Sequence, residues 1–383
     1  MGIHLNPGNE YFTEIVNSKI YVDKSMMIAA IDDIINDWNN YICISCPPHF
    51  GKTITGNILS AYYSKGCDSR WIFDRLKISE VEGYGDKLNK FNVIKIDMNS
   101  EYKKAGDKTA LIRTLEDTIK EEMRKEFLEI DILNEDSLAK SILKVYSETG
   151  EQFIIIIDEY DVLVREQVEE SLLSEYLSFL SGLFKSETLR PAIAFAYLTG
   201  MLPAVKDKIQ GRLNNLEGYT MLDAGKFTEY MGFTEDEVKN LCVRYGMDFE
   251  ECRRWYGGYD LDGFEIYNPE SVVKSMIKGE YGFYRSEILS HEIISDWIRQ
   301  NHKGLKDYVL CLMAGKSVDV NVGLFLNTMN SFACASDMLT YLIHLGYLAY
   351  DQQEEICRIP NEEVRMEWMR IIRELNEYEI IDS

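Results

Sequence analysis

At 383 residues the chain is long enough to bury a hydrophobic core and to form two or three domains. Its composition, 46% hydrophobic and 12% aromatic residues, is that of a globular protein and excludes an intrinsically disordered one. A formal net charge of −23 opposes the approach of a nucleic-acid backbone, which argues against nucleic acid as the main ligand.

The sequence contains no apolar run of the roughly 18–20 residues that span a bilayer, and no basic start followed by an apolar signal core. We therefore expect no membrane insertion and a cytoplasmic location. The cysteines are scattered through apolar patterns, which predicts reduced thiols in the core. Cys43 and Cys46 form a C-x-x-C, but no second pair or histidine cluster is near, which favours packing over a metal or redox site.

The first part of the chain combines a strand pattern with a helix pattern. Residues 20–25 indicate the end of a strand followed by a helix cap. Apolar residues then recur at helical spacing through residue 35.

The most informative local pattern is an apolar strand over residues 41–45 that breaks into the turn Gly51-Lys52-Thr53. It predicts a phosphate-binding loop and a following helix over residues 53–63, whose positive N-terminus faces the nucleotide. Lys52 would point into a solvent-filled loop and reach the β- and γ-phosphates, and the Thr53 hydroxyl would bind Mg²⁺. A plain core strand also fits this pattern when it is taken alone. The residues expected to contact ATP are Pro48, His49, Phe50, Gly51, Lys52, Thr53 and Ile54.

A second apolar run, over residues 153–157, ends in the carboxylates Asp158 and Glu159. The two motifs in this order favour a nucleotide site over two unrelated core strands. A further strand pattern over residues 91–98 lies between them in the sequence. This spacing is typical of P-loop ATPases with another strand between the two motif strands, which place a catalytic glutamate beside the aspartate that binds Mg²⁺. Asp158 is therefore the expected metal ligand, and Glu159 is the expected catalytic glutamate.

Two helix patterns and one more strand complete the expected core. The pattern over residues 111–127 is amphipathic, and we expect its charged face at 120–125 to be solvated. A helix over about 168–185 precedes a strand over 192–198. Thr199, at the tip of that strand, is a candidate contact to the γ-phosphate or the attacking water, and an ordinary strand end explains it equally well.

Beyond residue 225 the alternation of strands and helices stops. Residues 227–238 predict short helices with a Thr cap and an acidic first turn, and residues 255–269 are rich in aromatic side chains and turns. A helix over 336–345, a two-stranded wing and a helix from residue 361 indicate a winged-helix-like module. The acidic tip of the wing, 351–355, favours an intramolecular or protein contact over DNA binding.

These patterns predict an α/β chain in three parts. Residues 1–224 form a P-loop ATPase core with a parallel sheet and an N-terminal extension. Residues 225–290 form a region of short helices, and residues 291–383 a helical, winged-helix-like C-terminal domain.

Several ordered motifs resemble the AAA-ATPase-like family, whose members usually carry a C-terminal PD-(D/E)XK nuclease-like domain. The resemblance extends from about residue 3 to 370 and rests on Tyr21-Val22-Asp23-Lys24, the loop from Pro47 to Thr53, Ile157-Asp158-Glu159-Tyr160-Asp161, Leu198-Thr199-Gly200, Leu213-Asn214-Asn215-Leu216, Trp255-Tyr256-Gly257-Gly258-Tyr259, Tyr267-Asn268-Pro269 and Gly346-Tyr347-Leu348.

The resemblance implies a P-loop ATPase core with an α-helical lid, which would be residues 225–290. It implies that Lys52 and Thr53 contact the nucleotide and Mg²⁺, and that Asp158 and Glu159 are the Mg²⁺-binding and water-activating acids.

The chain departs from the family pattern in three respects. Cys46, Pro48 and His49 stand where the family loop commonly has arginines, which removes charge-assisted contacts to a triphosphate. Gly257 stands where the lid motif normally has Asp or Asn. No Asp followed by a Glu-x-Lys strand occurs after residue 350, so we expect no nuclease chemistry in this chain.

The first functional reading is an ATP-binding and ATP-hydrolysing switch, in which γ-phosphate occupancy positions the lid against the core. Such an ATPase is expected to need a cationic finger, supplied by a partner protein, by a homo-oligomer or by this chain. The candidates in the chain are Arg165, Arg190 and Arg212, each of which also fits a surface salt bridge.

The alternative reading is a nucleotide-binding or inactive scaffold that recruits a partner protein. The altered loop supports it, and the intact Asp158-Glu159 pair speaks against it. Nucleic-acid binding by the C-terminal region is a third reading, which rests on Arg253, Arg254 and Arg358.

Overall fold

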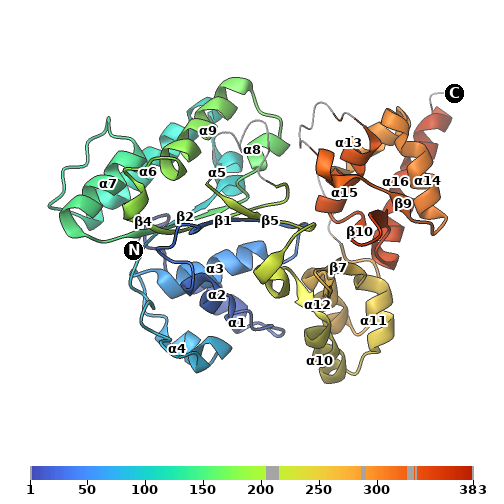
Figure 1. Cartoon of the computed structure of the whole chain (residues 1–383), viewed down its shortest axis with the longest axis horizontal. Helices are drawn as coiled ribbons and strands as arrows, with labels where there is room; N and C mark the ends of the chain where they lie inside the picture. The colour runs from blue at the N-terminus through green and yellow to red at the C-terminus, as the bar shows by residue number, and fades with distance from the viewer. Residues whose placement is uncertain (1, 204–214, 286–289, 326–331, 333, 382–383) are drawn as a thin grey trace. The chain divides into compact units, whose positions relative to one another are not determined.

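The structure is a computed structural model that describes residues 2–203, 215–285, 290–325, 332 and 334–381. The chain divides into two compact units (Figure 1). Unit 1 comprises Met1–Ser45 and Lys52–Tyr219, and unit 2 comprises Cys46–Gly51 and Thr220–Ser383. The predicted phosphate-binding loop thus groups with unit 2, although the strand before it and the helix after it belong to unit 1.

Unit 1 is built on a five-stranded sheet of order β2-β3-β4-β1-β5 in which all neighbouring strands are parallel. β1, β3 and β4 are buried along their whole length, as expected for parallel strands covered by helices on both faces. The strands are β1 Tyr41–Ser45, β2 Asn92–Asp97, β3 Phe153–Asp158, β4 Ile193–Gly200 and β5 Glu217–Tyr219. The prediction of a parallel α/β core is confirmed, and the strand between the two motif strands is β4.

Helices cover both faces of this sheet (Figure 1). One face carries α1 Glu10–Val16, α2 Met27–Asp32, α3 Lys52–Tyr63 and α4 Arg70–Phe73. The other carries α5 Met98–Lys104, α6 Leu111–Glu126, α7 Leu138–Thr149, α8 Val162–Arg165 and α9 Glu170–Phe184. The main core lies between the sheet and α6, α7 and α9, where apolar side chains recur at helical spacing.

The strand expected over residues 20–25 is not formed, since these residues are irregular or in turns. Asp23 accounts for this conformation. Its carboxylate accepts the backbone N–H groups of Ser25, at 2.8 Å, and Lys77, at 2.7 Å. The segment is held by a side chain instead of by a neighbouring strand.

The charged face of α6 is not wholly solvated, which corrects the expectation from its sequence. Lys120 is 3% exposed and donates to the backbone oxygens of Asn134, at 2.8 Å, and Asp136, at 2.9 Å. Glu122 accepts the backbone N–H groups of residues 3–5 at 2.7–3.0 Å. These two charged side chains fasten distant segments to the helix, because buried polar groups need hydrogen-bond partners.

The first part of unit 2 mixes helices with a small antiparallel sheet of order β6-β8-β7. Its elements are η4 Gly225–Tyr230, β6 Phe233–Thr234, α10 Glu235–Tyr245, α11 Phe249–Tyr256, β7 Tyr259–Leu261, β8 Phe264–Tyr267 and α12 Pro269–Lys278. The predicted Thr cap is confirmed, since Thr234 and Glu237 form a capping box on α10. The hairpin β7–β8 occupies the stretch that the sequence indicated only as aromatic and turn-rich.

The remainder of unit 2 contains α13 Ser290–Arg299, η5 His302–Gly304, α14 Leu305–Met313, β9 Val318–Asp319, η6 Val322–Leu324, α15 Ala335–His344, β10 Ala349–Asp351, β11 Ile356–Arg358 and α16 Glu362–Ile381. The predicted order of helix, antiparallel hairpin and helix is present in α15, β10–β11 and α16. β9 adds a third strand to the hairpin. Trp368 of α16 is fully buried, meets the Tyr347 ring at 5.6 Å between centroids and donates to the backbone oxygen of Tyr347 at 3.2 Å.

All eight cysteines are free thiols. Burial raises the pKa of the Cys43 thiol to about 12, so this thiol of the C-x-x-C is unreactive at neutral pH. Cys311 is exposed, which departs from the expectation of core thiols throughout. Among the described residues no group of three or more His, Cys, Asp or Glu side chains is placed to hold a metal ion.

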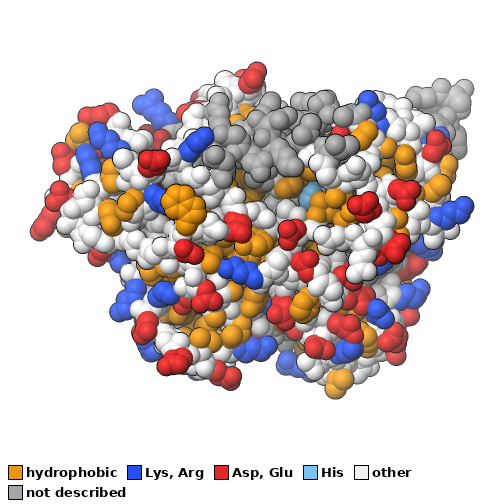
Figure 2. All heavy atoms as spheres, viewed as in Figure 1, with side chains coloured by type: hydrophobic (Ala, Val, Ile, Leu, Met, Phe, Trp, Pro, Cys, Tyr) orange, Lys and Arg blue, Asp and Glu red, His pale blue; other side chains and the backbone are white. Residues whose placement is uncertain are grey.

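No helix in the described part of the chain is both long enough and apolar enough to cross a membrane. On the face drawn in Figure 2, carboxylates are interspersed with lysines and arginines over the surface of each unit. Both signs of charge are numerous in the sequence, which has 64 acidic and 41 basic residues.

The core between α6, α7 and α9 can be tested with one substitution at two positions. Leu180 is fully buried on α9, so Leu180→Ala should lower the free energy of unfolding by about 2–5 kcal/mol through lost burial and a residual cavity. Leu128 is 84% exposed, so Leu128→Ala should change it by less than about 0.5 kcal/mol. Urea denaturation of both variants checks this, and similar losses at the two positions would contradict the packing.

Candidate nucleotide site

The loop between β1 and α3 contains two residues with left-handed backbone conformations. His49 and Gly51 adopt left-handed conformations, with φ of +67° and +93°. Glycine enters this region without strain, and open space surrounds the position where a Cβ would stand on Gly51. α3 then begins at Lys52 and runs for 12 residues, so its first N–H groups and its dipole provide the positive end that the sequence predicted.

Lys52 is buried, whereas the two residues that follow it are exposed. Lys52 is only 6% exposed, which corrects the expectation that it points into solvent. Its ammonium group lies close enough to Glu159 to lower the pKa of that carboxyl group, which explains why a charged side chain is accommodated here. Thr53 and Ile54 are exposed.

The loop's other predicted contacts are divided between packing and the surface. Phe50 is 2% exposed, so its side chain is a packing group. Pro48 is half-buried, and the imidazole of His49 is 35% exposed, with Nδ1 lying 3.3 Å from Glu270 Oε2.

The end of β3 brings Asp158 and Thr199 together. Asp158 is 3% exposed, and its Oδ1 accepts the Thr199 hydroxyl at 2.5 Å and the Glu159 N–H at 3.1 Å. Parallel pairing of β3 with β4 causes this contact, since Ile157 is in register with Leu198. The hydroxyl of Thr199 thus orients the carboxylate, a role that the sequence analysis did not consider.

Glu159 follows directly in a strained conformation. Its φ is +54°, which is uncommon for a residue with a side chain and persists only where surrounding contacts fix it. The carboxylate forms an ion pair with Arg165 through Oε2 and Nη2. Burial raises the pKa of Glu159, and the positive charges of Arg165 and Lys52 oppose that rise.

Asp161 fastens the ends of β3 and β4 to each other. Its Oδ2 accepts the backbone N–H groups of Met201, at 3.0 Å, and Leu202, at 2.9 Å. The same oxygen lies 3.1 Å from Nε of Arg165. A Cβ at Gly200 would lie only 2.6 Å from Asp161 Oδ1, so this arrangement requires glycine there. The sequence pointed to Asp161 only as a motif member, and its spacing of four from Arg165 was the available signal.

Two of the three arginines that are candidates for the cationic finger contact other residues of the chain. Arg165 binds Glu159 and Asp161, as described above. Arg190 lies 4.4 Å above the Trp38 ring and 5.3 Å from the Tyr41 ring centroid. Tyr41 begins β1, so Arg190 is at the opposite end of the strand from the phosphate loop. Arg212, together with Leu213 and Asn214 of the family motif, lies outside the described residues.

A further cation, which the sequence analysis missed, is Lys95 on β2. Its ammonium group donates to Asn57 Oδ1 on α3. Burial lowers the pKa of Lys95, and the negative charges of Asp158 and Asp97 oppose that change. The available signal was a lysine within the otherwise apolar strand pattern over residues 91–98.

Asp158 at the end of β3 and Thr53 at the start of α3 carry the type of oxygen ligand that a magnesium ion takes. Mg²⁺ takes oxygen ligands and usually binds through one or two carboxylates plus phosphates. Both hydrogen bonds of Asp158 go to Oδ1, and the Thr53 hydroxyl is exposed at the start of α3. A carboxylate oxygen and a hydroxyl therefore suit the ion.

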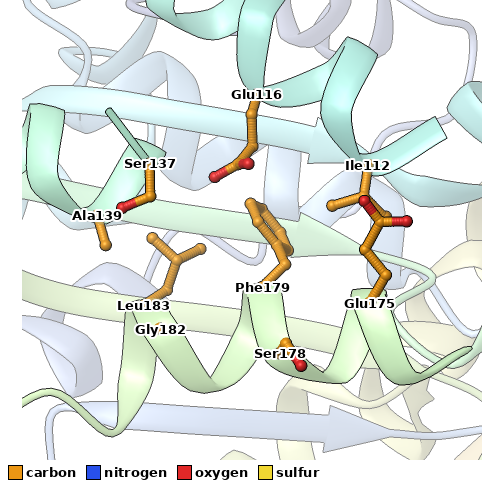
Figure 3. Close-up of a pocket in the computed structure, with 9 residues that line it drawn as sticks. All are labelled: Ile112, Glu116, Ser137, Ala139, Glu175, Ser178, Phe179, Gly182 and Leu183. Carbon is orange, nitrogen blue, oxygen red and sulfur yellow. The ribbon is translucent and has the colours of Figure 1, made fainter. Parts of the chain in front are cut away.

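A separate groove lies between α6, α7 and α9 and has a cavity volume of about 240 Å³. In Figure 3 the Glu116 and Glu175 side chains flank Phe179 in this groove. None of the residues predicted to bind nucleotide or metal is in its lining.

Asp161→Ala tests the connection between β3 and β4. It removes one of the two carboxylate partners of Arg165 and the acceptor of two buried N–H groups, so we expect the free energy of unfolding to fall by about 2–4 kcal/mol. The amides of Met201 and Leu202 should also exchange faster with solvent in hydrogen-exchange measurements. Asp131→Ala, at an exposed position, is the matched control. Unchanged protection at residues 201–202 would contradict the assigned contacts.

Residues 7–210 match the family model described as predicted AAA-ATPase. An uncharacterized protein encoded in the vnfD 5′ region of Azotobacter chroococcum mcd 1 is 22% identical over 253 residues. That alignment covers 64% of this chain and 46% of the relative, so the matched part is about half the length of that protein.

Two solved structures show low overall similarity. Cdc6p of Pyrobaculum aerophilum has a TM-score of 0.35 at 13% identity, with 95% of this chain and 98% of that chain covered. The ORC2 protein of Aeropyrum pernix, in ADPNP–ADP complexes, has a TM-score of 0.40 at 11% identity, with 96% and 98% covered. The family model spans more than half of the sequence, and the chain therefore belongs to the AAA-ATPase-like family of predicted AAA-ATPases.

Proposed function

We propose that this protein binds ATP with Mg²⁺ at Cys46–Gly51 and the start of α3, and hydrolyses it as a molecular switch. The observation that carries the proposal is the convergence of Lys52, Asp158, Glu159 and Thr199 at the carboxyl ends of three neighbouring strands. Family membership supports an ATPase-type function in general. We retain the division into a core, a lid at 225–290 and a C-terminal domain at 291–383 as part of the proposal.

The proposed roles follow from charge and position. Lys52 and the first N–H groups of α3 neutralise the β- and γ-phosphates. Thr53 and Asp158 hold Mg²⁺, which would neutralise charge on the phosphate oxygens. Thr199 fixes the orientation of Asp158 through its hydroxyl. Glu159 accepts a hydrogen bond from the attacking water and orients it toward the γ-phosphate.

The remaining cation is proposed to come from outside the chain. Arg165 and Arg190 are both engaged in contacts within unit 1, and the third candidate, Arg212, lies outside the described residues. A partner protein or a second copy of the chain would then supply the finger, and the isolated chain would hydrolyse ATP slowly.

One observation favours a second function, a nucleotide-binding scaffold that recruits a partner without hydrolysis. The carboxylate of Glu159 is already paired with Arg165, and a paired carboxylate is a weaker hydrogen-bond acceptor for water. The loss of family arginines at Cys46, Pro48 and His49 points the same way.

Lys52→Ala should abolish ATP binding, because the ammonium group at the start of α3 is lost. Isothermal titration calorimetry with ATP and Mg²⁺ measures the affinity, and circular dichroism verifies the fold of the variant. Lys65→Ala is the control, since Lys65 pairs with Glu151 at 2.6 Å instead. Equal ATP affinity in the wild type and Lys52→Ala would refute the site.

Glu159→Gln should leave ATP binding intact and lower turnover by roughly 10²–10⁴-fold, because the side chain keeps its shape but loses the charge that polarises water. Phosphate release under saturating ATP measures turnover. Glu166→Gln, at an exposed neighbouring position, is the control. If the wild type binds ATP but releases no phosphate, with or without candidate partners, the scaffold function is the correct one.

A further inference from the structure

The loop Cys46–Gly51 packs within unit 2 through Phe50. This side chain is 2% exposed, and its ring meets the Tyr259 ring edge-on at 5.5 Å between centroids. A Cβ at Gly232 would lie 3.1 Å from the Phe50 ring. Tyr259 belongs to the motif Trp255-Tyr256-Gly257-Gly258-Tyr259, for which the proposed ATPase chemistry provides no role.

A second motif of unit 2 meets the loop at Pro47. Gly346, of Gly346-Tyr347-Leu348, has φ of +74°, and a Cβ there would lie 2.8 Å from Pro47 Cγ. The carbonyl oxygen of Gly346 accepts the Tyr259 hydroxyl at 2.7 Å and Nη1 of Arg285 at 3.0 Å. Arg285 is buried and also donates to the carbonyl oxygen of Leu345 at 2.9 Å. Gly346 is therefore fixed by hydrogen bonds to its carbonyl oxygen while its α-carbon faces the loop.

The third motif acts through Glu270. Asn268, of Tyr267-Asn268-Pro269, caps α12 and accepts the Glu270 N–H at 2.9 Å, which fixes the position of that residue. Oε2 of Glu270 is the atom that lies 3.3 Å from Nδ1 of His49. The other carboxylate oxygen pairs with Lys274 at 2.8 Å. His49 is the loop residue with the strained left-handed backbone, so this contact lies where the loop most needs support.

We propose that these three motifs together form a seat for the phosphate-binding loop, and that Tyr259, Glu270 and Gly346 are positioning residues for nucleotide binding. The seat holds the loop in its anion-binding conformation before nucleotide arrives, so less ordering is required on binding. Because such coupling is reciprocal, nucleotide bound at the loop stabilises the seat in return. This inference rests on the proposed function for its effect on ATP, but not for its effect on the loop itself.

Two glycine substitutions separate seating from backbone strain. Gly346 and Gly279 both have φ of +74°, so alanine meets the same left-handed penalty at either position. At Gly279, however, a Cβ would meet nothing within 4 Å. Only Gly346→Ala displaces Pro47, and Gly279→Ala is its matched control.

Hydrogen exchange of residues 46–51 without nucleotide and ATP affinity with Mg²⁺ are measured on the full chain. We expect faster loop exchange and ATP binding at least about tenfold weaker in Gly346→Ala, with neither change in Gly279→Ala. Equal loop exchange in the two variants overturns the seat. Faster exchange with unchanged ATP affinity overturns its role in nucleotide binding.

The experiment also covers a wild type that binds no ATP and a variant that does not fold. If the wild type binds no ATP, the proposed function fails, and the role in nucleotide binding fails with it, while loop exchange still decides the seat. If Gly346→Ala does not fold, Tyr259→Phe replaces it, because this change removes only the hydroxyl that holds Gly346. Tyr284→Phe, which removes a hydroxyl bonded to the carbonyl oxygen of Glu280 at 3.1 Å, is then the control. Faster loop exchange in Tyr259→Phe alone supports the seat, and equal exchange overturns it.

Discussion

The parallel register of β1, β4 and β3 is the constraint on which the rest of the site depends. β4 lies between the other two strands, and Thr199 is paired with Ile44 of β1 while the preceding Leu198 is paired with Ile157 of β3. Because all three strands run in the same direction, their polar ends meet at one edge of the sheet. A shift of one residue would turn the Thr199 hydroxyl away from Asp158 and toward the opposite face.

This register brings several charged side chains together at a buried position. Five charged side chains near the ends of these strands are at most about one-fifth exposed: Lys52, Asp158, Glu159, Asp161 and Arg165. Buried charges destabilise a fold unless they are paired and hydrogen-bonded, and here each carboxylate has a cation or backbone N–H groups beside it. The pairing of Glu159 with Arg165 stabilises the carboxylate and occupies one of its two oxygens.

Unit 2 holds the loop Cys46–Gly51 through packing contacts. Its aromatic and glycine motifs carry no acid–base chemistry, yet they gather at Cys46–Gly51 through a ring contact, a close glycine approach and an ion pair. The left-handed conformation of His49 is costly for a residue with a side chain, and packing from the rest of unit 2 helps to hold it. This gives a reason for motifs hundreds of residues apart to occur in one chain.

The sequence by itself determined the strand, turn and helix around Lys52, the paired carboxylates at 158 and 159, and the helix–hairpin–helix order near the C-terminus. Each depends on a local pattern, such as an apolar run, a glycine turn or helical periodicity, that few neighbouring residues decide. Tertiary structure alone decided that Thr199 binds Asp158, that Lys120 is buried and that Gly346 lies against Pro47. These contacts join residues that are far apart in sequence, and the packing of whole elements, which no local pattern encodes, brings them together.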